Sequence, residues 1–93
     1  MKLKPHGLAL VNFVIDFVNG DMERMFFDMD YSHYVITNFP YFEKEHPRLA
    51  KRFADTVDVA YDMGQNLSDE DLRYSLSEAL DVFMGNDGEC DLI

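Results

Sequence analysis

The sequence predicts an all-α protein, a compact bundle of four or five short helices. Apolar residues recur at spacings of three and four along most of the chain, which is typical of helices with one buried face. Prolines lie at the expected first turns of helices, and single glycines lie where those helices are expected to end. The strongest apolar run has no second run of comparable strength with which it could pair as a strand.

The chain is short enough to form only one domain. With 93 residues it buries about two-thirds of its unfolded surface, and its 47% hydrophobic content argues against intrinsic disorder. We expect residues 1–85 to form a single helical domain and residues 86–93 to form a flexible acidic tail. The only cysteine, Cys90, lies in that tail, so no internal disulfide can form and a cytoplasmic location is expected.

Pro5 and Gly20 bracket the first expected helix, from about His6 to Asn19. Its polar interior residues share a helical spacing and form one narrow solvent stripe: Asn12, Asp16 and Asn19. The rest of its surface is apolar, so we expect this helix at the centre of the bundle. A buried strand is the alternative, because the run contains several β-branched residues.

A second helix is expected after Asp21, which can cap it. Its apolar stripe follows the i, i+3, i+4, i+7 pattern: Met22, Met25, Phe26 and Met29. Pro40 should end any helix that reaches it at or before Phe39, because proline lacks a backbone N–H and clashes with the preceding turn. The sequence leaves open whether the segment 31–42 is helical or extended.

Pro47 suits the first turn of a third helix, which we expect to run to about Met63 and to end at Gly64. Five of its residues should face inward: Leu49, Phe53, Val57, Ala60 and Tyr61.

Ser68 and Asp71 resemble a capping box and predict the start of a fourth helix, which Gly85 should close. The buried face of this helix is expected to consist of Leu72, Leu76, Leu80 and Phe83.

The net charge of −10 lies entirely in the second half of the chain. Residues 1–52 carry seven acids and seven bases, whereas residues 53–93 carry eleven acids and a single base, Arg73. Such a field repels nucleic acid and anionic membranes and attracts basic surfaces. We therefore expect neither direct nucleic-acid binding nor membrane binding. The apolar run of the first helix is also shorter than the roughly 20 residues that a membrane span needs.

The sequence offers no recognisable catalytic or metal-binding pattern. The segment from Asp28 begins like a calcium loop, but His33 and Phe39 occupy the positions of its essential Gly and Glu. The three histidines lack the i, i+4 spacing of zinc ligands on a helix, and the scattered glycines form no phosphate loop. We expect no enzymatic activity, no cofactor and no resident metal.

Two sets of acids predict an acidic surface. Asp55, Asp58 and Asp62 share one face of the third helix, and Asp71, Glu78 and Asp81 recur by similar steps on the fourth. If these helices pack antiparallel with both faces outward, the six acids form one ridge. The third helix also begins with bases and ends with acids, which opposes its dipole. Tertiary pairing or plain solvation explains this order, or else the acids bind a basic partner.

Aromatic residues concentrate between Phe26 and Phe42, where seven of the thirteen occur. They point to more than one face of any helix, so we expect some of them to remain exposed and available for self-association. The candidate hydrophobic interface comprises Met25, Phe27, Tyr31, Tyr34, Tyr41 and Phe42. Complete burial of these side chains within a monomer is the alternative.

These patterns together predict a non-enzymatic interaction protein whose acidic second half docks a basic protein surface. One extension of this hypothesis is an inhibitor from a phage or mobile element whose helical carboxylates imitate nucleic-acid phosphates. The alternative is a structural or accessory module that forms homodimers through the Met and aromatic segment, with the acids serving only solubility.

Overall fold

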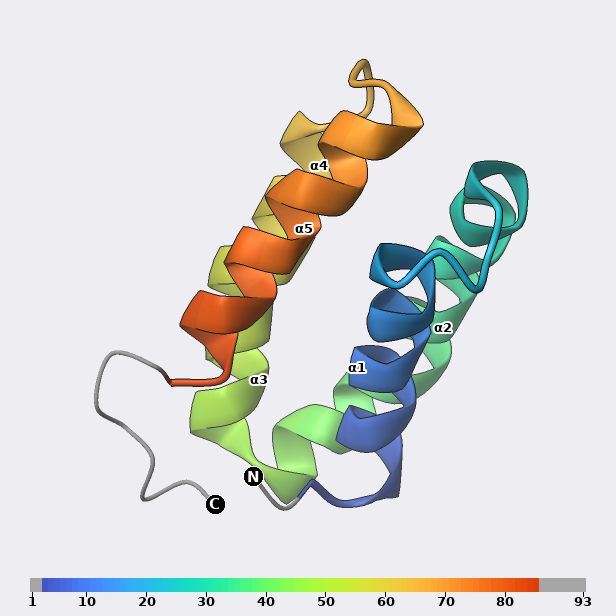
Figure 1. Cartoon of the computed structure of the whole chain (residues 1–93). Coiled ribbons are helices and arrows are strands. Elements are labelled where there is room, and N and C mark those ends of the chain that lie inside the picture. The colour runs from blue at the N-terminus through green and yellow to red at the C-terminus, as the bar shows by residue number, and fades with distance from the viewer. Residues whose placement is uncertain (1–2, 86–93) are drawn as a thin grey trace.

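The computed structural model describes residues 3–85, which form four helical rods (Figure 1). In chain order, the rods are α1 (Pro5–Val18), α2 (Arg24–Glu45), a continuous run of α3 (Pro47–Phe53), the π-helical segment η1 (Ala54–Asp58) and α4 (Val59–Met63), and finally α5 (Asp69–Phe83). The described residues contain no strand, so the predicted all-α class is confirmed. The predicted acidic tail, residues 86–93, lies outside the described residues.

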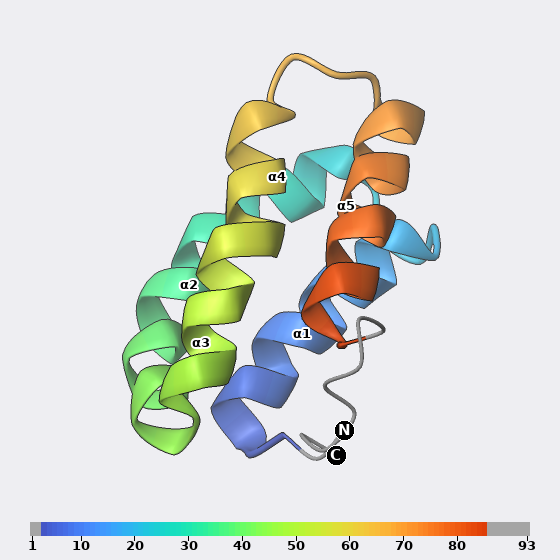
Figure 2. The ribbon, with the colours of Figure 1, turned by 90° about the vertical axis from the view of Figure 1, so that its left-hand side faces the viewer.

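Each rod packs mainly against the two rods beside it. α1 contacts α2 and α5, and the rod that runs from α3 to α4 contacts the same two helices. Figure 2 shows the resulting square, in which α2 and α5 stand at opposite corners. The expectation that α1 is a central helix is wrong, because α1 occupies one corner. Leu8 is 44% exposed there and widens the solvent face beyond the polar stripe.

Aromatic rings join the rods in the core. Phe17 of α1 stacks on Phe27 of α2 with 4.2 Å between ring centroids. Farther along the bundle, Phe53 packs edge-to-face on Phe42 and on Phe83, at 6.1 and 5.7 Å. Such pairs contribute about 0.5–1.5 kcal/mol each beyond the burial of their surface. All four rods are therefore tied together by ring contacts.

The turn between α1 and α2 corrects the expected role of Asp21. Gly20 adopts a positive φ of 85°, its N–H donates to the Phe17 carbonyl, and the N–H of Asp21 donates to the Asp16 carbonyl. This pattern is a Schellman motif, which closes a helix at its carboxyl end. Asp21 therefore completes α1 and does not cap α2, which begins three residues later at Arg24.

Pro40 lies inside α2, so the expectation that it ends the helix is wrong. The helix continues to Glu45, and the segment 31–42 is helical throughout. A proline inside a helix costs about 3 kcal/mol, because it removes one hydrogen bond and crowds the preceding turn. Pro40 is exposed, whereas Phe42 in the next turn is fully buried. Burial of that turn offsets the cost of the proline.

The third rod contains the π-helical segment η1, which no pattern in the sequence predicts. There the Thr56 hydroxyl donates a 2.7 Å hydrogen bond to the Arg52 carbonyl. A π turn holds one residue more than an α turn, so it shifts the register of the residues that follow. Three of the residues predicted to face inward are buried, and two are partly buried: Leu49, Phe53 and Val57, and then Ala60 and Tyr61.

The predicted start and buried face of α5 are confirmed. The Ser68 side chain accepts a 3.2 Å hydrogen bond from the backbone N–H of Asp71. The predicted inward residues are all buried: Leu72, Leu76, Leu80 and Phe83. The hydroxyl cap and the apolar spacing thus act on the same helix.

Candidate functional site

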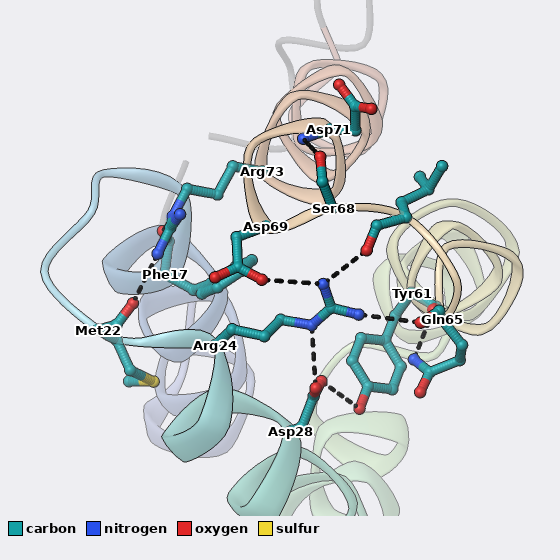
Figure 3. Close-up of polar contacts among 11 residues, drawn as sticks. Phe17, Met22, Arg24, Asp28, Tyr61, Gln65, Ser68, Asp69, Asp71 and Arg73 are labelled. Atoms are coloured by element: carbon teal, nitrogen blue, oxygen red, sulfur yellow. Dashed lines mark hydrogen bonds and ion pairs between the residues drawn. The ribbon is translucent and has the colours of Figure 1, made fainter.

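Arg24, at the start of α2, holds the loop that joins α4 to α5 (Figure 3). Its Nη1 donates to the Leu67 carbonyl at 2.8 Å, and its Nη2 donates to the Gln65 carbonyl at 3.0 Å. Its Nε pairs with Asp28 at 2.9 Å, and Nη1 also approaches Asp69 at 3.3 Å. The Arg24 side chain is only 15% exposed. The Arg24 guanidinium therefore contacts groups of its own chain and presents little charge to solvent.

Arg73 of α5 holds the other loop at this end of the bundle, between α1 and α2 (Figure 1). Its Nε donates to the Phe17 carbonyl at 2.8 Å, and its Nη2 donates to the Met22 carbonyl at 3.1 Å. Its guanidinium also lies over the Phe17 ring, 4.5 Å from the centroid. The planar guanidinium suits both contacts, because it can donate in a fork and stack at the same time. Arg24 of the α1–α2 hairpin thus holds the α4–α5 loop, and Arg73 of the α4–α5 hairpin holds the α1–α2 loop. We call this pair of contacts the arginine clamp.

Acidic side chains on α4 and α5 point the other way, into solvent. We call the acidic face the exposed carboxylates that belong to Asp62, Glu70, Asp71, Glu78 and Asp81. Tyr74 is 67% exposed and lies one helical turn from Glu70 on one side and from Glu78 on the other. The second half of the chain therefore presents an aromatic ring among carboxylates.

Four of the six acids predicted from the sequence lie on the acidic face: Asp62, Asp71, Glu78 and Asp81. The other two have partners within the chain. Asp55 pairs with Lys51 at 3.1 Å, and Asp58 accepts a 2.7 Å hydrogen bond from the Tyr31 hydroxyl. Asp58 faces α2 because η1 changes the helical register between it and Asp55. The single ridge of six acids expected from the sequence is therefore wrong.

Glu70 belongs to the acidic face and was missed by the sequence reasoning. It precedes Tyr74 by four residues and Glu78 by eight, which is the same helical spacing that selected the other acids. Asp69, beside it, is also exposed but contacts Arg24. Periodicity alone could have identified Glu70, whereas the contact of Asp69 depends on a residue far away in the sequence.

The order of charges on the third rod has a tertiary explanation. This rod and α5 run antiparallel, so the bases of α3 lie beside the carboxyl end of α5 (Figure 2). There the Nη1 of Arg52 donates to the Phe83 carbonyl at 3.3 Å. A helix carries partial negative charge at its carboxyl end, and α5 has no base of its own in its last turn. The bases of α3 supply that missing charge.

A groove of about 360 Å³ lies where α3 and η1 meet α5. Its lining combines basic and apolar side chains with one acid: Arg48, Leu49, Lys51, Arg52, Asp55, Thr56 and Val82. The outer surface of these two rods is therefore basic at one end and acidic at the other.

The candidate hydrophobic interface is only partly exposed, and half of it must be corrected. Phe27 and Phe42 are fully buried and Tyr31 is 3% exposed, because all three fill the core between α2 and its neighbours. Tyr34 is partly buried against Phe13, at 4.2 Å between centroids. Met25 and Tyr41 are exposed, at 63% and 52%. Phe26 and Met29, which the sequence assigned to the apolar stripe of this helix, are also exposed, and so is Ile36, which the sequence reasoning missed.

One buried and one partly buried tyrosine face carboxylates between α2 and the third rod. Burial raises the pKa of Tyr31 far above its ordinary value, and the hydrogen bond to Asp58 adds to that effect. Burial also raises the pKa of Tyr61, whose hydroxyl donates a 3.0 Å hydrogen bond to Asp28. Both hydroxyls therefore stay protonated at neutral pH and act as donors that hold the carboxylates in place.

His6 and Glu45 join the start of α1 to the end of α2. The His6 ring donates from Nδ1 to Glu45 at 2.8 Å and stacks on Tyr41 at 4.5 Å between centroids. The hydrogen bond from His6 lowers the pKa of Glu45, and a long contact with the Gly7 N–H acts in the same direction. This contact closes the end of the bundle opposite the loop that joins α4 to α5 (Figure 1).

Within residues 3–85, no three His, Cys, Asp or Glu side chains gather closely enough to hold a metal ion. Over that same stretch, no helix combines the length and hydrophobicity needed to cross a membrane.

No protein-family model, curated protein or solved structure matches the chain. The arrangement of side chains thus offers two surfaces for binding: the acidic face and the exposed side of α2.

Proposed function

We propose that this chain is a binding protein whose acidic face docks a basic protein surface. The observation that supports this most is the unequal use of charge around α5. The nearby bases, Arg24 and Arg73, point inward and donate to backbone carbonyls, whereas the carboxylates of the acidic face point into solvent. The local field outside the bundle is therefore strongly negative and attracts cationic partners.

Helix stability does not account for all of these acids. Asp71 and Glu70 lie in the first turn of α5, where acids favour the helix dipole. Asp81 lies in its last turn, where an acid disfavours the dipole by about 0.3–1 kcal/mol, and Glu78 lies one turn earlier. A partner that supplies positive charge at this end of α5 would remove that penalty and gain affinity from it.

Tyr74 gives the acidic face an apolar anchor. Binding energy at interfaces concentrates in a few aromatic or Arg residues near the centre, while the surrounding charges steer approach and set specificity. Tyr74 is 67% exposed, and Met63 at the end of α4 is 80% exposed. We therefore expect the partner to present Lys or Arg side chains around an apolar patch that receives the Tyr74 ring.

A protein that ordinarily binds nucleic acid would suit this face, because its basic surface already accepts a row of negative charges. In that case the chain would act as an inhibitor that competes with DNA or RNA. Competition between the chain and a DNA duplex for the captured partner tests this narrower form of the proposal.

Affinity capture from the native host lysate, at about 50 and 500 mM salt, tests the docking proposal. The test variant combines Glu70→Gln, Asp71→Asn, Glu78→Gln and Asp81→Asn. The matched control removes the same number of exposed charges from the other side of the bundle, by Asp16→Asn, Asp21→Asn, Glu23→Gln and Asp30→Asn.

We expect the wild type and the control to capture one partner at low salt and to lose it at high salt, because salt screens exposed charges. The test variant should fail to capture it at either concentration while melting like the control. Capture that persists at high salt, or that both variants lose equally, would contradict the proposal.

A further inference from the structure

The outer side of α2 carries an apolar seam with the spacing of a coiled coil. We call the outer seam the exposed residues at the a and d positions of this heptad pattern: Met25, Met29, Ser32 and Ile36. Met25, Met29 and Ile36 are 63, 68 and 74% exposed. The seam faces away from the core, since Phe27 and Phe42 occupy the opposite side of the same helix.

The charge of the chain makes the outer seam the surface on which a second copy meets the least repulsion. Two chains with a net charge of −10 repel each other wherever their acids meet. The segment 31–42 contains no Asp, Glu, Lys or Arg, so two copies meet there with the least repulsion. The acidic face belongs mainly to α5, which stands at the corner of the bundle opposite α2 (Figure 2).

An antiparallel pairing fits the seam better than a parallel one. The first half of α2 contains Asp28 and Asp30, whereas residues 31–42 are uncharged. Asp28 pairs with Arg24 of its own chain, and Asp30 lies on another side of α2 than the seam, so neither acid decides the direction of pairing. Antiparallel packing sets the two helix dipoles in opposite directions, which is favourable.

The heptad pattern then defines which side chains meet. In an antiparallel pair, a positions of one helix face d positions of the other, and a two-fold axis repeats every contact. Met25 therefore faces Ile36 of the second copy, and Met29 faces Ser32. Phe26, which is 54% exposed, flanks this seam on one side.

The exposed area suits a dimer of modest affinity. If a large side chain exposes roughly 200 Å² when free, the exposed parts of Met25, Phe26, Met29 and Ile36 amount to about 500 Å² on each copy. A pair could therefore bury about 1,000 Å². That is about the smallest area expected of a biological interface, and it corresponds to weak association. We propose that α2 pairs antiparallel with α2 of a second copy through the outer seam, which makes the protein a reversible homodimer. This inference does not depend on the proposed function of the acidic face.

Cysteine cross-linking of the full chain tests the register directly. In a Cys90→Ser background, the variant Met25→Cys with Ile36→Cys should form a covalent dimer on mild oxidation, whereas each single substitution should not. These two positions lie about 16 Å apart along one helix, which is too far for a disulfide within one chain. The matched control, Asp30→Cys with Tyr41→Cys, has the same spacing at exposed positions outside the seam and should form no covalent dimer.

Sedimentation of the wild type should show a mass that rises with concentration, and Ile36→Glu should abolish that rise without lowering the melting temperature, because Ile36 is exposed. A wild type that stays monomeric up to about 500 μM would overturn the dimer. Cross-linking of the single Ile36→Cys variant would overturn the antiparallel register, because only a parallel pair places Ile36 against itself.

Discussion

The Tyr31 hydroxyl donates a 2.7 Å hydrogen bond to Oδ1 of Asp58, which joins α2 to the π-helical segment of the third rod. Tyr31 is only 3% exposed, so this bond lies at the edge of the core. The contact removes Asp58 from the solvent face that its spacing from Asp55 and Asp62 suggests. It also gives the carboxylate a structural role, because the bond fixes η1 against α2.

Replacement of Tyr31 by Phe should lower the free energy of unfolding by about 1–3 kcal/mol. The substitution keeps the ring in the core but leaves the half-buried Asp58 carboxylate without its donor. Urea unfolding, followed by circular dichroism, measures the change. Tyr74→Phe is the control at an exposed tyrosine and should change stability by less than about 0.5 kcal/mol. Equal effects of the two substitutions would show that the bond contributes nothing.

Stability should fall in alkaline solution, from about pH 10 upward. The pKa of Tyr31 is raised above its ordinary value of 10.0 by burial, and then by its hydrogen bond to Asp58. Above pH 10 the tyrosine ionises in the unfolded chain but not in the folded chain, so the unfolded state gains stability. Tyr61 acts in the same direction, because burial raises its pKa as well.

Melting temperatures between pH 8 and 11 check this prediction. The wild type should be steady up to about pH 10 and should then decline. The Tyr31→Phe variant should have a lower melting temperature at pH 8, but its melting temperature should decline less steeply above pH 10, because it has lost the group with the raised pKa. A parallel decline of both proteins would assign the effect to other groups.

The pKa of Glu45 should rise toward its ordinary value of 4.5 when His6 is replaced by Ala. In the wild type the hydrogen bond from His6 lowers the pKa of this carboxyl. The resulting stabilisation is present above pH 4.5 and is lost as the pH falls through the pKa of the folded state. NMR titration of the Glu45 carboxyl measures the change. His33→Ala, at an exposed histidine on α2, should leave that titration where it is.

Replacement of Arg24 by Lys should lower the free energy of unfolding by about 2–4 kcal/mol, although it keeps the charge. A single ammonium group cannot reach the Leu67 carbonyl, the Gln65 carbonyl and Asp28 together, as the guanidinium does. Chemical unfolding measures the loss. Asp69→Asn removes only the longer, exposed contact and should cost less than about 1 kcal/mol. A Lys variant as stable as the wild type would refute the arginine clamp.

Replacement of Gly7 by Ala should lower the free energy of unfolding by about 1–3 kcal/mol, through overpacking. An added Cβ would lie 2.7 Å from two atoms of the buried Phe42 ring. Phe42→Leu, with its smaller side chain, should reduce the penalty of the Ala substitution. A double-mutant cycle over these two positions checks this coupling, and strict additivity would show that the two residues do not compete for space.

The sequence by itself determined where most helices begin and end. Gly20 and Ser68 act through hydrogen bonds to residues within about one helical turn, and Pro5 and Pro47 act through their fixed φ, so their effects depend on local chemistry alone. The periodicity of leucines likewise determined the buried face of α5. The numbers of acidic and basic residues determined the net negative charge. Four acids of the acidic face followed from the same periodicity.

Only the tertiary structure decided the passage of α2 through Pro40, the register after η1 and the inward direction of Arg24 and Arg73. Each depends on partners far away in the chain, such as the Phe17 carbonyl, which lies 56 residues from Arg73. The aromatic residues of α2 were divided between core and surface for the same reason. A helical pattern shows which side chains share a face, but only packing against other helices decides which face is covered.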